Sequence, residues 1–427
     1  MKIGLEVHVA LPTKSKLFCS CSSGAEEPNT AICPTCLGFP GSRPMLNEEA
    51  LKRSVTIAKA VHCKVNEKTH FIRKVYFYPD LPKSYQITQL EGAIGHCGYV
   101  DIERKRIRIR RVQIEEDPAR IIHADDYSLL DFNRSGVALN EIVTEPDIES
   151  EAELREFMSE LRSILFYAGV DIDKEMKVDL NISVGAEKVE IKNITGIKNL
   201  VDAERFEEKR QEELIASNKR VATETRSYSE ETMSTVPSRE KETDEEYGFI
   251  YEPDLAVYPT NGIIPYATVI ASELAKQYSG KRKETIKTIK ELVMFDREAL
   301  KLIQYGVGQS NIETVINAIE VLKRRGKIRM PEKGFGKMLD LLDKGIVLDD
   351  DAIAALNDGE DVEAEKHGVS TEEIDREILN VLSQRPDLVK EYKTNKKVFN
   401  SIVGIVIKKY KVSPKHVAER LALVLGE

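Results

Sequence analysis

The sequence predicts an α+β protein with a mixed-sheet domain first, then a helical domain, then a small all-α tail domain. Runs in which apolar and polar residues alternate, as in strands, occur in the first 280 residues or so. After that point, apolar residues recur at helical spacing. A chain of 427 residues is also long enough for two or three folding units. We therefore expect domains at residues 1–280, 281–368 and 369–427.

The first domain is predicted to mix strands with helices. The polar segment Ala222–Tyr251 could be a linker, but its Tyr247, Phe249 and Ile250 favour a long functional loop that returns to the domain. The predicted strands are Ile3–Val9, Lys105–Ile114, Lys177–Val184 and Val189–Ile194, and the predicted helices are Glu149–Tyr167 and Asp202–Asn218.

Helices are predicted throughout the remainder of the chain, at Lys283–Gln304, Ile312–Arg325 and Phe335–Lys344. An acidic stretch at Asn357–Glu365 interrupts the pattern. Ser370, followed three residues later by Glu373, then predicts the start of a helix in the tail domain.

The composition is that of a globular protein, with 41% hydrophobic and 32% charged residues. No apolar run approaches the roughly 18 residues of a membrane span, and the first residues lack the pattern of a signal or transit peptide. We therefore expect a cytoplasmic protein. The net charge of −9 excludes an overall basic surface, so any RNA contact must be local.

Two local basic runs could contact RNA, although a solvated surface is the favoured explanation of each run taken alone. They comprise Arg104, Lys105, Arg106, Arg108, Arg110 and Arg111 in the first domain, and Lys393, Lys396, Lys397, Lys408, Lys409 and Lys411 in the tail.

Four of the six cysteines are spaced as metal ligands. Cys19, Cys21, Cys33 and Cys36 form C-x-C and C-P-x-C pairs that can surround a tetrahedral ion, and zinc is the expected one. Because four protein ligands leave no open position, we expect a structural role. The alternative is four ordinary buried thiols. The remaining pair, Cys63 and Cys97, is expected to be buried.

Carboxylates alternate with apolar residues along several predicted strands. Glu6 and His8 share one face of the first strand, and the same period groups Gln113, Glu115 and Asp117, then Asp179, Asn181 and Ser183, then Glu190 and Lys192. Carboxylates from several strands suit Mg²⁺ and hence ATP chemistry. A sheet with one solvated polar face is an equally good explanation of alternation alone.

Two common signatures are absent. The sequence has no G-x-x-x-x-G-K-[ST] phosphate loop, and Lys2 excludes an N-terminal cysteine nucleophile. If the protein uses ammonia, a partner must supply it.

Several stretches, in a fixed order over nearly the whole chain, resemble a known family. They are Gly4–His8, Cys36–Gly41, Tyr76–Ile87, Glu115–Asp117, Asp131–Gly136, Glu141–Asp147, Val178–Val184, Glu190–Asn193 and Glu252–Leu255. Together they resemble the B subunits of the aspartyl/glutamyl-tRNA(Asn/Gln) amidotransferases, the GatB family. Order and spacing, rather than any single motif, carry the resemblance.

The resemblance implies a cradle-shaped first domain and a tail domain that grips tRNA. It also implies a magnesium site near the reaction centre, formed by Glu6, His8, Glu115, Glu141 and Asp179. Lys74 and Lys83 match positions along the route by which ammonia arrives, where Glu115 would act as a gate. Candidate tRNA contacts in the tail are Lys393, Lys396, Lys397, Lys408 and Lys409.

The implied activity is ATP-dependent amidation of Asp-tRNA(Asn), Glu-tRNA(Gln) or both, a carbon–nitrogen ligation with glutamine as the nitrogen donor. The side-chain carboxylate would become an acyl phosphate, which ammonia from a partner amidase A subunit would attack, and a small C subunit would complete the complex.

Some positions depart from the commonest family pattern. Residues 118–120 read Pro-Ala-Arg in place of Ala-Gly-Lys, and Gly248 stands where arginine is usual. Two functions from other classes stay open: a free-standing ATP-dependent ligase for a small acid, and a non-enzymatic zinc-containing RNA-binding protein.

Overall fold

The computed structural model describes residues 1–427 except 173–175, 239–247, 280–282, 327, 345, 361, 363–367, 386–395, 411–413 and 426–427. The chain divides into two compact units, residues 1–270 and 271–427. The first is a sheet with helices and the second is mainly helical, so the predicted α+β class is confirmed. No described helix is long and apolar enough to cross a membrane.

A sheet of nine strands, in the order β14-β13-β12-β11-β1-β10-β7-β6-β2, forms the centre of the first unit. All four predicted strands belong to it. Its members are β1 (Lys2–Ala10), β2 (Lys64–Val65), β6 (Gly95–Asp101), β7 (Arg106–Glu116), β10 (Ala138–Thr144), β11 (Lys177–Ser183), β12 (Val189–Thr195), β13 (Glu224–Ser229) and β14 (Ser234–Pro237).

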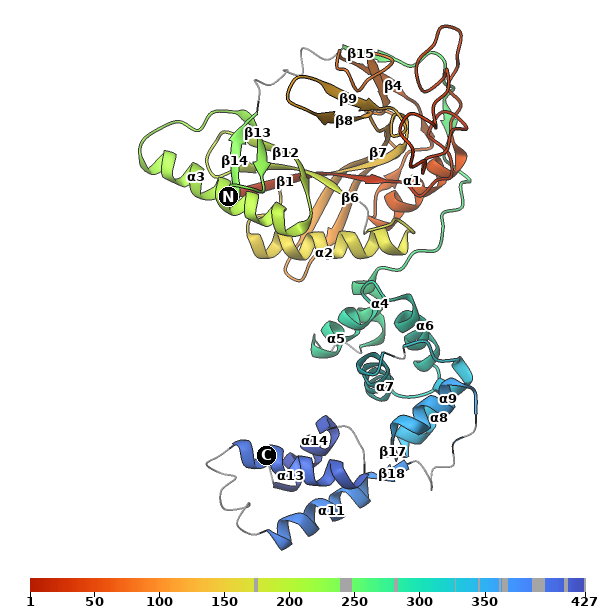
Figure 1. Ribbon diagram of the computed structural model, residues 1–427, viewed down its shortest axis with the longest axis vertical. Coiled ribbons are helices and arrows are strands. Elements are labelled where there is room, and N and C mark those ends of the chain that lie inside the picture. Colours follow the sequence, from red (N-terminus) through yellow and green to blue (C-terminus); the bar gives the residue numbers. More distant parts are fainter. Residues whose placement is uncertain are drawn as a thin grey trace. The chain divides into compact units, whose positions relative to one another are not determined.

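Helices α1 (Glu48–Ala60), α2 (Glu151–Tyr167) and α3 (Ile197–Ala216) accompany this sheet. In Figure 1, α2 and α3 lie below the sheet, and strands β4, β8, β9 and β15 lie above it. Side chains of α2 such as Phe157 and Leu161 share a core with Leu5 and Val7 of β1. Because side chains alternate along a strand, Glu6 and His8 point to the opposite face.

Smaller sheets complete the first unit. A three-stranded sheet joins β15 (Gly248–Tyr251), β4 (Ile72–Val75) and β5 (Tyr85–Thr88). Two-stranded pairs join β3 (Lys68–Thr69) with β16 (Tyr258–Pro259), and β8 (Arg120–His123) with β9 (Ser128–Asp131). The segment predicted as a long returning loop thus contributes β13 and β14 to the large sheet and β15 to the three-stranded sheet.

The second unit contains the predicted helices, with one correction. The predicted helix Lys283–Gln304 is two helices, because Phe295 has a positive φ of 60° and the Asp296 side chain caps a new helix by accepting from Ala299 N. The helices among its described residues are α4 (Ala271–Tyr278), α5 (Lys283–Val293), α6 (Arg297–Gly306), α7 (Ile312–Arg324), α8 (Glu332–Asp343), α9 (Asp350–Asn357), α11 (Thr371–Gln384), α13 (Lys396–Tyr410) and α14 (Pro414–Leu425).

Strands β17 (Ile346–Leu348) and β18 (Gly368–Ser370) pair just before α11. The predicted helix start at Ser370 is confirmed, since Ser370 and Glu373 form a capping box. Helices α11, α13 and α14 share a hydrophobic core of their own, which includes Ile374, Ile402 and Leu421. The three domain boundaries stay predictions.

Candidate functional site

Strand β1 brings carboxylates from both of its neighbours alongside its own polar side chains. It pairs antiparallel with β10 on one side and β11 on the other, which sets His8 opposite Glu141 and Glu6 opposite Asp179. Cross-strand neighbours of this kind have their Cβ atoms only about 5 Å apart. The sheet register therefore concentrates acidic groups along one strand.

The first group consists of His8, Glu115 and Glu141. His8 Nε2 lies 3.4 Å from Glu115 Oε1 and 3.9 Å from Glu141 Oε2. Gln113 Nε2 donates to Glu141 Oε2 at 2.5 Å, and Thr88 Oγ1 donates to Glu115 Oε2 at 3.1 Å. The two carboxylates are buried, and these hydrogen bonds hold their orientation.

The second group consists of Glu6, Asp179 and Glu190, each of which offers a carboxylate oxygen within 4.8 Å of the others. Asn181 Nδ2 donates to Glu6 Oε1 at 3.3 Å, and the backbone N–H of Asn193 donates to Asp179 Oδ1 at 2.7 Å. Three carboxylates so close together repel one another unless a cation lies among them.

The electrostatics of the site follow from burial and crowding. Burial by itself would lower the pKa of His8, but the carboxylates of Glu115 and Glu141 outweigh it and raise that pKa. Burial, followed by the charge of Glu115, raises the pKa of Glu141 to about 7. Burial also raises the pKa of Asp179. Arg111 lies 3.6 Å from Glu141 Oε1 and Lys192 Nζ lies 3.7 Å from Glu190 Oε1, so two of the carboxylates also have a cationic neighbour.

The donor set of both groups fits a divalent cation. The second group offers only carboxylate oxygens, which are the ligands that Mg²⁺ prefers. The first adds an imidazole to two carboxylates, a set that divalent metals also accept. The five residues implied for magnesium therefore lie on one polar face but fall into two groups, and Glu190 joins the second.

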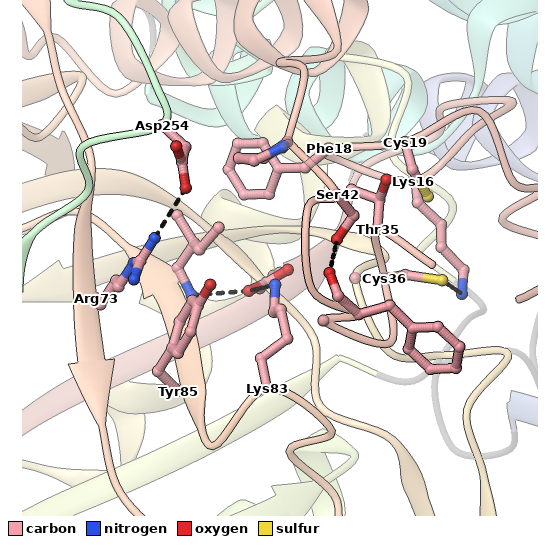
Figure 2. Close-up of a pocket in the computed structure, with 16 residues that line it drawn as sticks. Lys16, Phe18, Cys19, Thr35, Cys36, Ser42, Arg73, Lys83, Tyr85 and Asp254 are labelled. Atoms are coloured by element: carbon pink, nitrogen blue, oxygen red, sulfur yellow. Dashed lines mark hydrogen bonds and ion pairs between the residues drawn. The ribbon is translucent and has the colours of Figure 1, made fainter. Parts of the chain in front are cut away.

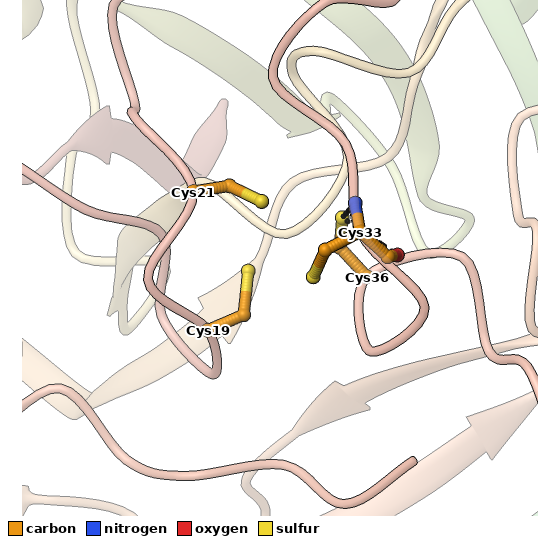
Figure 3. Close-up of side chains that lie close together, drawn as sticks. All are labelled: Cys19, Cys21, Cys33 and Cys36. Atoms are coloured by element: carbon orange, nitrogen blue, oxygen red, sulfur yellow. Dashed lines mark hydrogen bonds between the residues drawn. The ribbon is translucent and has the colours of Figure 1, made fainter.

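The four-cysteine loop gathers its sulfurs as the spacing predicts. The Sγ atoms of Cys19, Cys21, Cys33 and Cys36 all lie within 4.8 Å of one another (Figure 3). Four sulfurs about 2.3 Å from a tetrahedral zinc would be a little under 4 Å apart, which lies within this limit, so the arrangement is compatible with zinc. None of the four cysteines forms a disulfide.

A cavity of about 230 Å³ lies between the cysteine loop and the residues of β4 and β5 (Figure 2). Lys83 and Glu116 line it and form an ion pair, and Arg73 contacts Asp254 at 3.2 Å. Tyr85 lies between the two cations. The centre of its ring is 4.5 Å from the Arg73 guanidinium and 5.3 Å from Lys83 Nζ. Charged and polar side chains therefore make up much of the cavity lining.

Of the residues implied for the ammonia route, only Lys83 lines this cavity. Lys74 lies on β4, with its ammonium 5.8 Å from the centre of the Tyr76 ring. Glu115 contacts His8 instead, while its neighbour Glu116 contacts Lys83.

Residues 1–262 match a family model described as "GatB/GatE catalytic domain". A protein of Sulfurisphaera tokodaii is 37% identical over 471 aligned residues, which cover 100% of this chain and 99% of that protein. A protein of Persephonella marina is 34% identical, with 99% and 98% covered. Both are named as the B subunit of an aspartyl/glutamyl-tRNA(Asn/Gln) amidotransferase. The chain belongs to the GatB family.

GatB family membership confirms the resemblance carried by the short stretches. The match to the family's catalytic domain covers the whole of the large sheet, whose last strand, β14, ends at Pro237. Both carboxylate groups and the four-cysteine loop therefore lie inside the matched region. The tail domain lies outside it but within the full-length relatives.

One sequence-based prediction for this GatB chain is wrong, and one basic run is found to be paired with acidic residues. The expectation that Cys97 is buried is wrong: it is exposed, at a position of positive φ (53°) in β6, whereas Cys63 is buried as expected. The basic run at residues 105–111 is largely paired with acidic residues, through Lys105–Glu149, Arg106–Asp101, Arg108–Asp147, Arg110–Glu145 and Arg111–Glu141.

The candidate tRNA contacts of the tail are only partly described. Lys393 lies outside the described residues, and Lys396 and Lys397 begin helix α13. Lys408 and Lys409 are exposed near its end, and Lys409 pairs with Glu377 of α11. Their role in binding tRNA stays a prediction.

Proposed function

We propose that this GatB chain activates the side-chain carboxylate of Asp-tRNA(Asn), Glu-tRNA(Gln) or both with ATP and then amidates it. The observation that carries the proposal is the pair of carboxylate groups on the polar face of β1, within the region matched to the GatB/GatE catalytic domain. The named activity of the full-length relatives supplies the substrate class.

The metal ligands would be His8, Glu115 and Glu141 in one group and Glu6, Asp179 and Glu190 in the other. When bound there, Mg²⁺ would neutralise phosphate charge on ATP and so favour attack by another anion. Gln113 and Thr88 would hold the Glu141 and Glu115 carboxylates in place, through the hydrogen bonds described above. The sheet thus supplies a rigid, pre-oriented set of ligands.

The reaction balances in two steps. A carboxylate oxygen of the aminoacyl group bonds to the γ-phosphorus as ADP leaves. Ammonia then attacks the acyl carbon, and phosphate leaves with that carboxylate oxygen. Because only unprotonated ammonia is a nucleophile, its route must exclude bulk water while keeping groups that exchange protons.

The cavity beside Lys83 and Glu116 is our candidate for part of that route. Its ion pair and the Tyr85 hydroxyl offer polar groups within a partly enclosed space. Glu116 immediately follows Glu115 on β7, so one residue lines the cavity and the residue before it belongs to the first carboxylate group. Lys74, on strand β4 of the three-stranded sheet, is proposed to lie farther along the route.

The proposal includes a complex that works in the cytoplasm. An amidase A subunit would release ammonia from glutamine, a small C subunit would complete the assembly, and the tail domain would bind tRNA through lysines such as Lys408. Zinc held by the four cysteines would serve the fold rather than the chemistry, since four thiolates leave no open position.

The test is an amidation assay of the chain co-purified with its amidase and small subunits. Asp-tRNA and Glu-tRNA are supplied with ATP and Mg²⁺, and ammonium chloride replaces glutamine so that the glutaminase is bypassed. Wild type should form Asn-tRNA or Gln-tRNA, whereas Glu6→Gln and Glu115→Gln should lose the reaction. Glu212→Gln, an exposed acid on α3, is the matched control.

The other two function classes give different outcomes. A free-standing ligase would amidate a small acid without tRNA. A non-enzymatic RNA-binding protein would bind tRNA but form no ATP-dependent product. Either result would overturn the proposal.

A further inference from the structure

Lys16 is a lysine in an unusual place, because it is fully buried. Its Nζ lies 3.6 Å from Cys36 Sγ and donates to the carbonyl oxygen of Phe132 at 3.1 Å. Among the ion pairs of the described residues, none joins Lys16 to a carboxylate. A buried ammonium is costly unless nearby groups compensate its charge, and its two contacts are a sulfur and a carbonyl.

The four-cysteine loop can supply the missing negative charge. A zinc ion with four thiolates carries a net charge of −2, and part of that charge resides on each sulfur. An ammonium that donates to one of these sulfurs would offset it, and the sulfur would in turn compensate the buried ammonium. Lys16 contacts the cysteine loop on its buried side, since Cys36 is the buried member of the four.

The second contact of Lys16 leads towards the carboxylate site. Phe132 begins the segment 132–136, which precedes β10 and therefore Glu141. Other bonds fasten the cysteine loop to the same region: Asn29 Nδ2 donates to Leu130 O, and Asn133 Nδ2 donates to Glu27 O. Lys16 is thus the link that touches both a metal ligand and this segment.

We propose that Lys16 is a positioning residue that neutralises the zinc-bound Cys36 thiolate and fastens it to the segment leading into β10. The inference rests on the proposed zinc site. It assigns to Lys16 an effect on the metal that an ordinary buried side chain would not have, namely control of how tightly zinc is held and of the electronic state of one sulfur.

Zinc retention tests the first of these effects. Lys16→Met keeps a long apolar side chain but removes the charge and the donor. The full complex is stripped of loose metal, and zinc release to a chromophoric chelator is timed. Release should be about tenfold or more faster in Lys16→Met, because groups bonded to metal ligands commonly change metal affinity by ten- to a hundredfold. Lys14→Met, an exposed lysine two residues away, should match wild type.

Cobalt substitution tests the second effect. Removing a cationic donor raises the energy of the sulfur electrons, so the thiolate-to-cobalt charge-transfer band should move to longer wavelength in Lys16→Met. A merely structural role would leave that band in place. If Lys16→Met does not fold, Lys16→Gln provides the same reading, since its neutral amide should shift the band in the same direction.

The outcomes separate two kinds of failure. Wild type that retains neither zinc nor cobalt overturns the proposed metal site, and this inference with it. Wild type that retains zinc, beside Lys16 variants with unchanged release and an unmoved band, overturns the role of Lys16 alone.

Discussion

His8 Nε2 on β1 lies 3.4 Å from Glu115 Oε1 on β7, although β10 separates these two strands in the sheet. The contact passes over β10, whose Glu141 lies 3.9 Å from the same nitrogen. One imidazole therefore connects three strands. Without the imidazole, less positive charge would lie beside the two buried carboxylates, Glu115 and Glu141.

Replacing His8 should impair the reaction strongly. In His8→Ala, the positions of Glu115 and Glu141 are no longer held by a shared partner, and a potential metal ligand is lost. We expect the ammonium-driven amidation rate to fall about 100-fold, the size typical for loss of one pre-oriented electrostatic group. Initial rates at several Mg²⁺ concentrations measure this. A rate within twofold of wild type at every concentration would contradict the assigned site.

Lys83 should matter more for glutamine than for ammonium. Lys83→Met leaves Glu116 without its ion-pair partner in the cavity. If ammonia passes there, glutamine-driven amidation should fall while amidation driven by added ammonium chloride is largely retained. The ratio of the two rates is the measurement, and exposed Lys68→Met is the control. An equal loss of both rates would place Lys83 in the chemistry rather than on the route.

Loss of one cysteine ligand should release zinc and weaken the fold. Cys33→Ser removes one of four thiolates that lie within 4.8 Å of one another. Bound structural zinc contributes folding free energy, so the variant should contain less zinc and unfold at a lower temperature. Metal analysis and a thermal melt check this. Cys97→Ser, at an exposed cysteine, should keep both the zinc and the melting temperature.

Glu204 should make the first unit less stable at high pH. It is fully buried on α3, neither carboxylate oxygen has a hydrogen-bond partner among the described residues, and burial raises its pKa to about 7. Its folded pKa therefore exceeds the unfolded value, so its contribution to stability is fully present below about pH 4.5 and is lost as the pH rises through about 7.

Glu204→Gln tests this sign, because the amide cannot ionise. Relative to wild type, the variant should gain up to about 3 kcal/mol in free energy of unfolding on going from pH 5 to pH 8.5, since each pKa unit corresponds to about 1.4 kcal/mol. Urea unfolding at both pH values measures the difference, with Glu212→Gln beside it. A difference between Glu204→Gln and wild type that does not change with pH would show that Glu204 is not titrating as assigned.

Arg73 should be important for stability. Its guanidinium donates two hydrogen bonds to the fully buried Glu252, at 2.7 and 2.9 Å. Arg73→Ala would leave that carboxylate buried and unpaired, a change that costs about 3–5 kcal/mol. Denaturant unfolding gives the value. The exposed pair Arg106–Asp101 serves for comparison, and Arg106→Ala should leave stability unchanged.

Much of the candidate site follows from period-two alternation, for a physical reason. Alternation decides which side chains share a face, so Glu6 with His8, and Gln113 with Glu115, could be predicted from the sequence. Which strands become neighbours could not, because pairing between β1, β10 and β11 depends on contacts far apart in the chain. Glu141 was therefore reached only through the resemblance, and the division into two groups required the structure.

Other features could not be predicted from the sequence, for local reasons. A lysine beside four cysteines looks like a surface residue, so nothing in the sequence marked Lys16 as buried. The break between α5 and α6 depends on the positive φ of Phe295, which aromatic residues seldom adopt. The cations of β7 looked like a basic patch because their acidic partners, such as Glu145 and Asp147, lie some forty residues later.

The most direct test of the central claim follows an oxygen atom. Glu-tRNA or Asp-tRNA labelled with ¹⁸O in the side-chain carboxylate is amidated by the wild-type complex with ATP and ammonium chloride, and the released phosphate is examined by mass spectrometry. If the carboxylate attacks the γ-phosphate, each turnover should place one ¹⁸O in inorganic phosphate. Unlabelled phosphate alongside amidated tRNA would contradict the account.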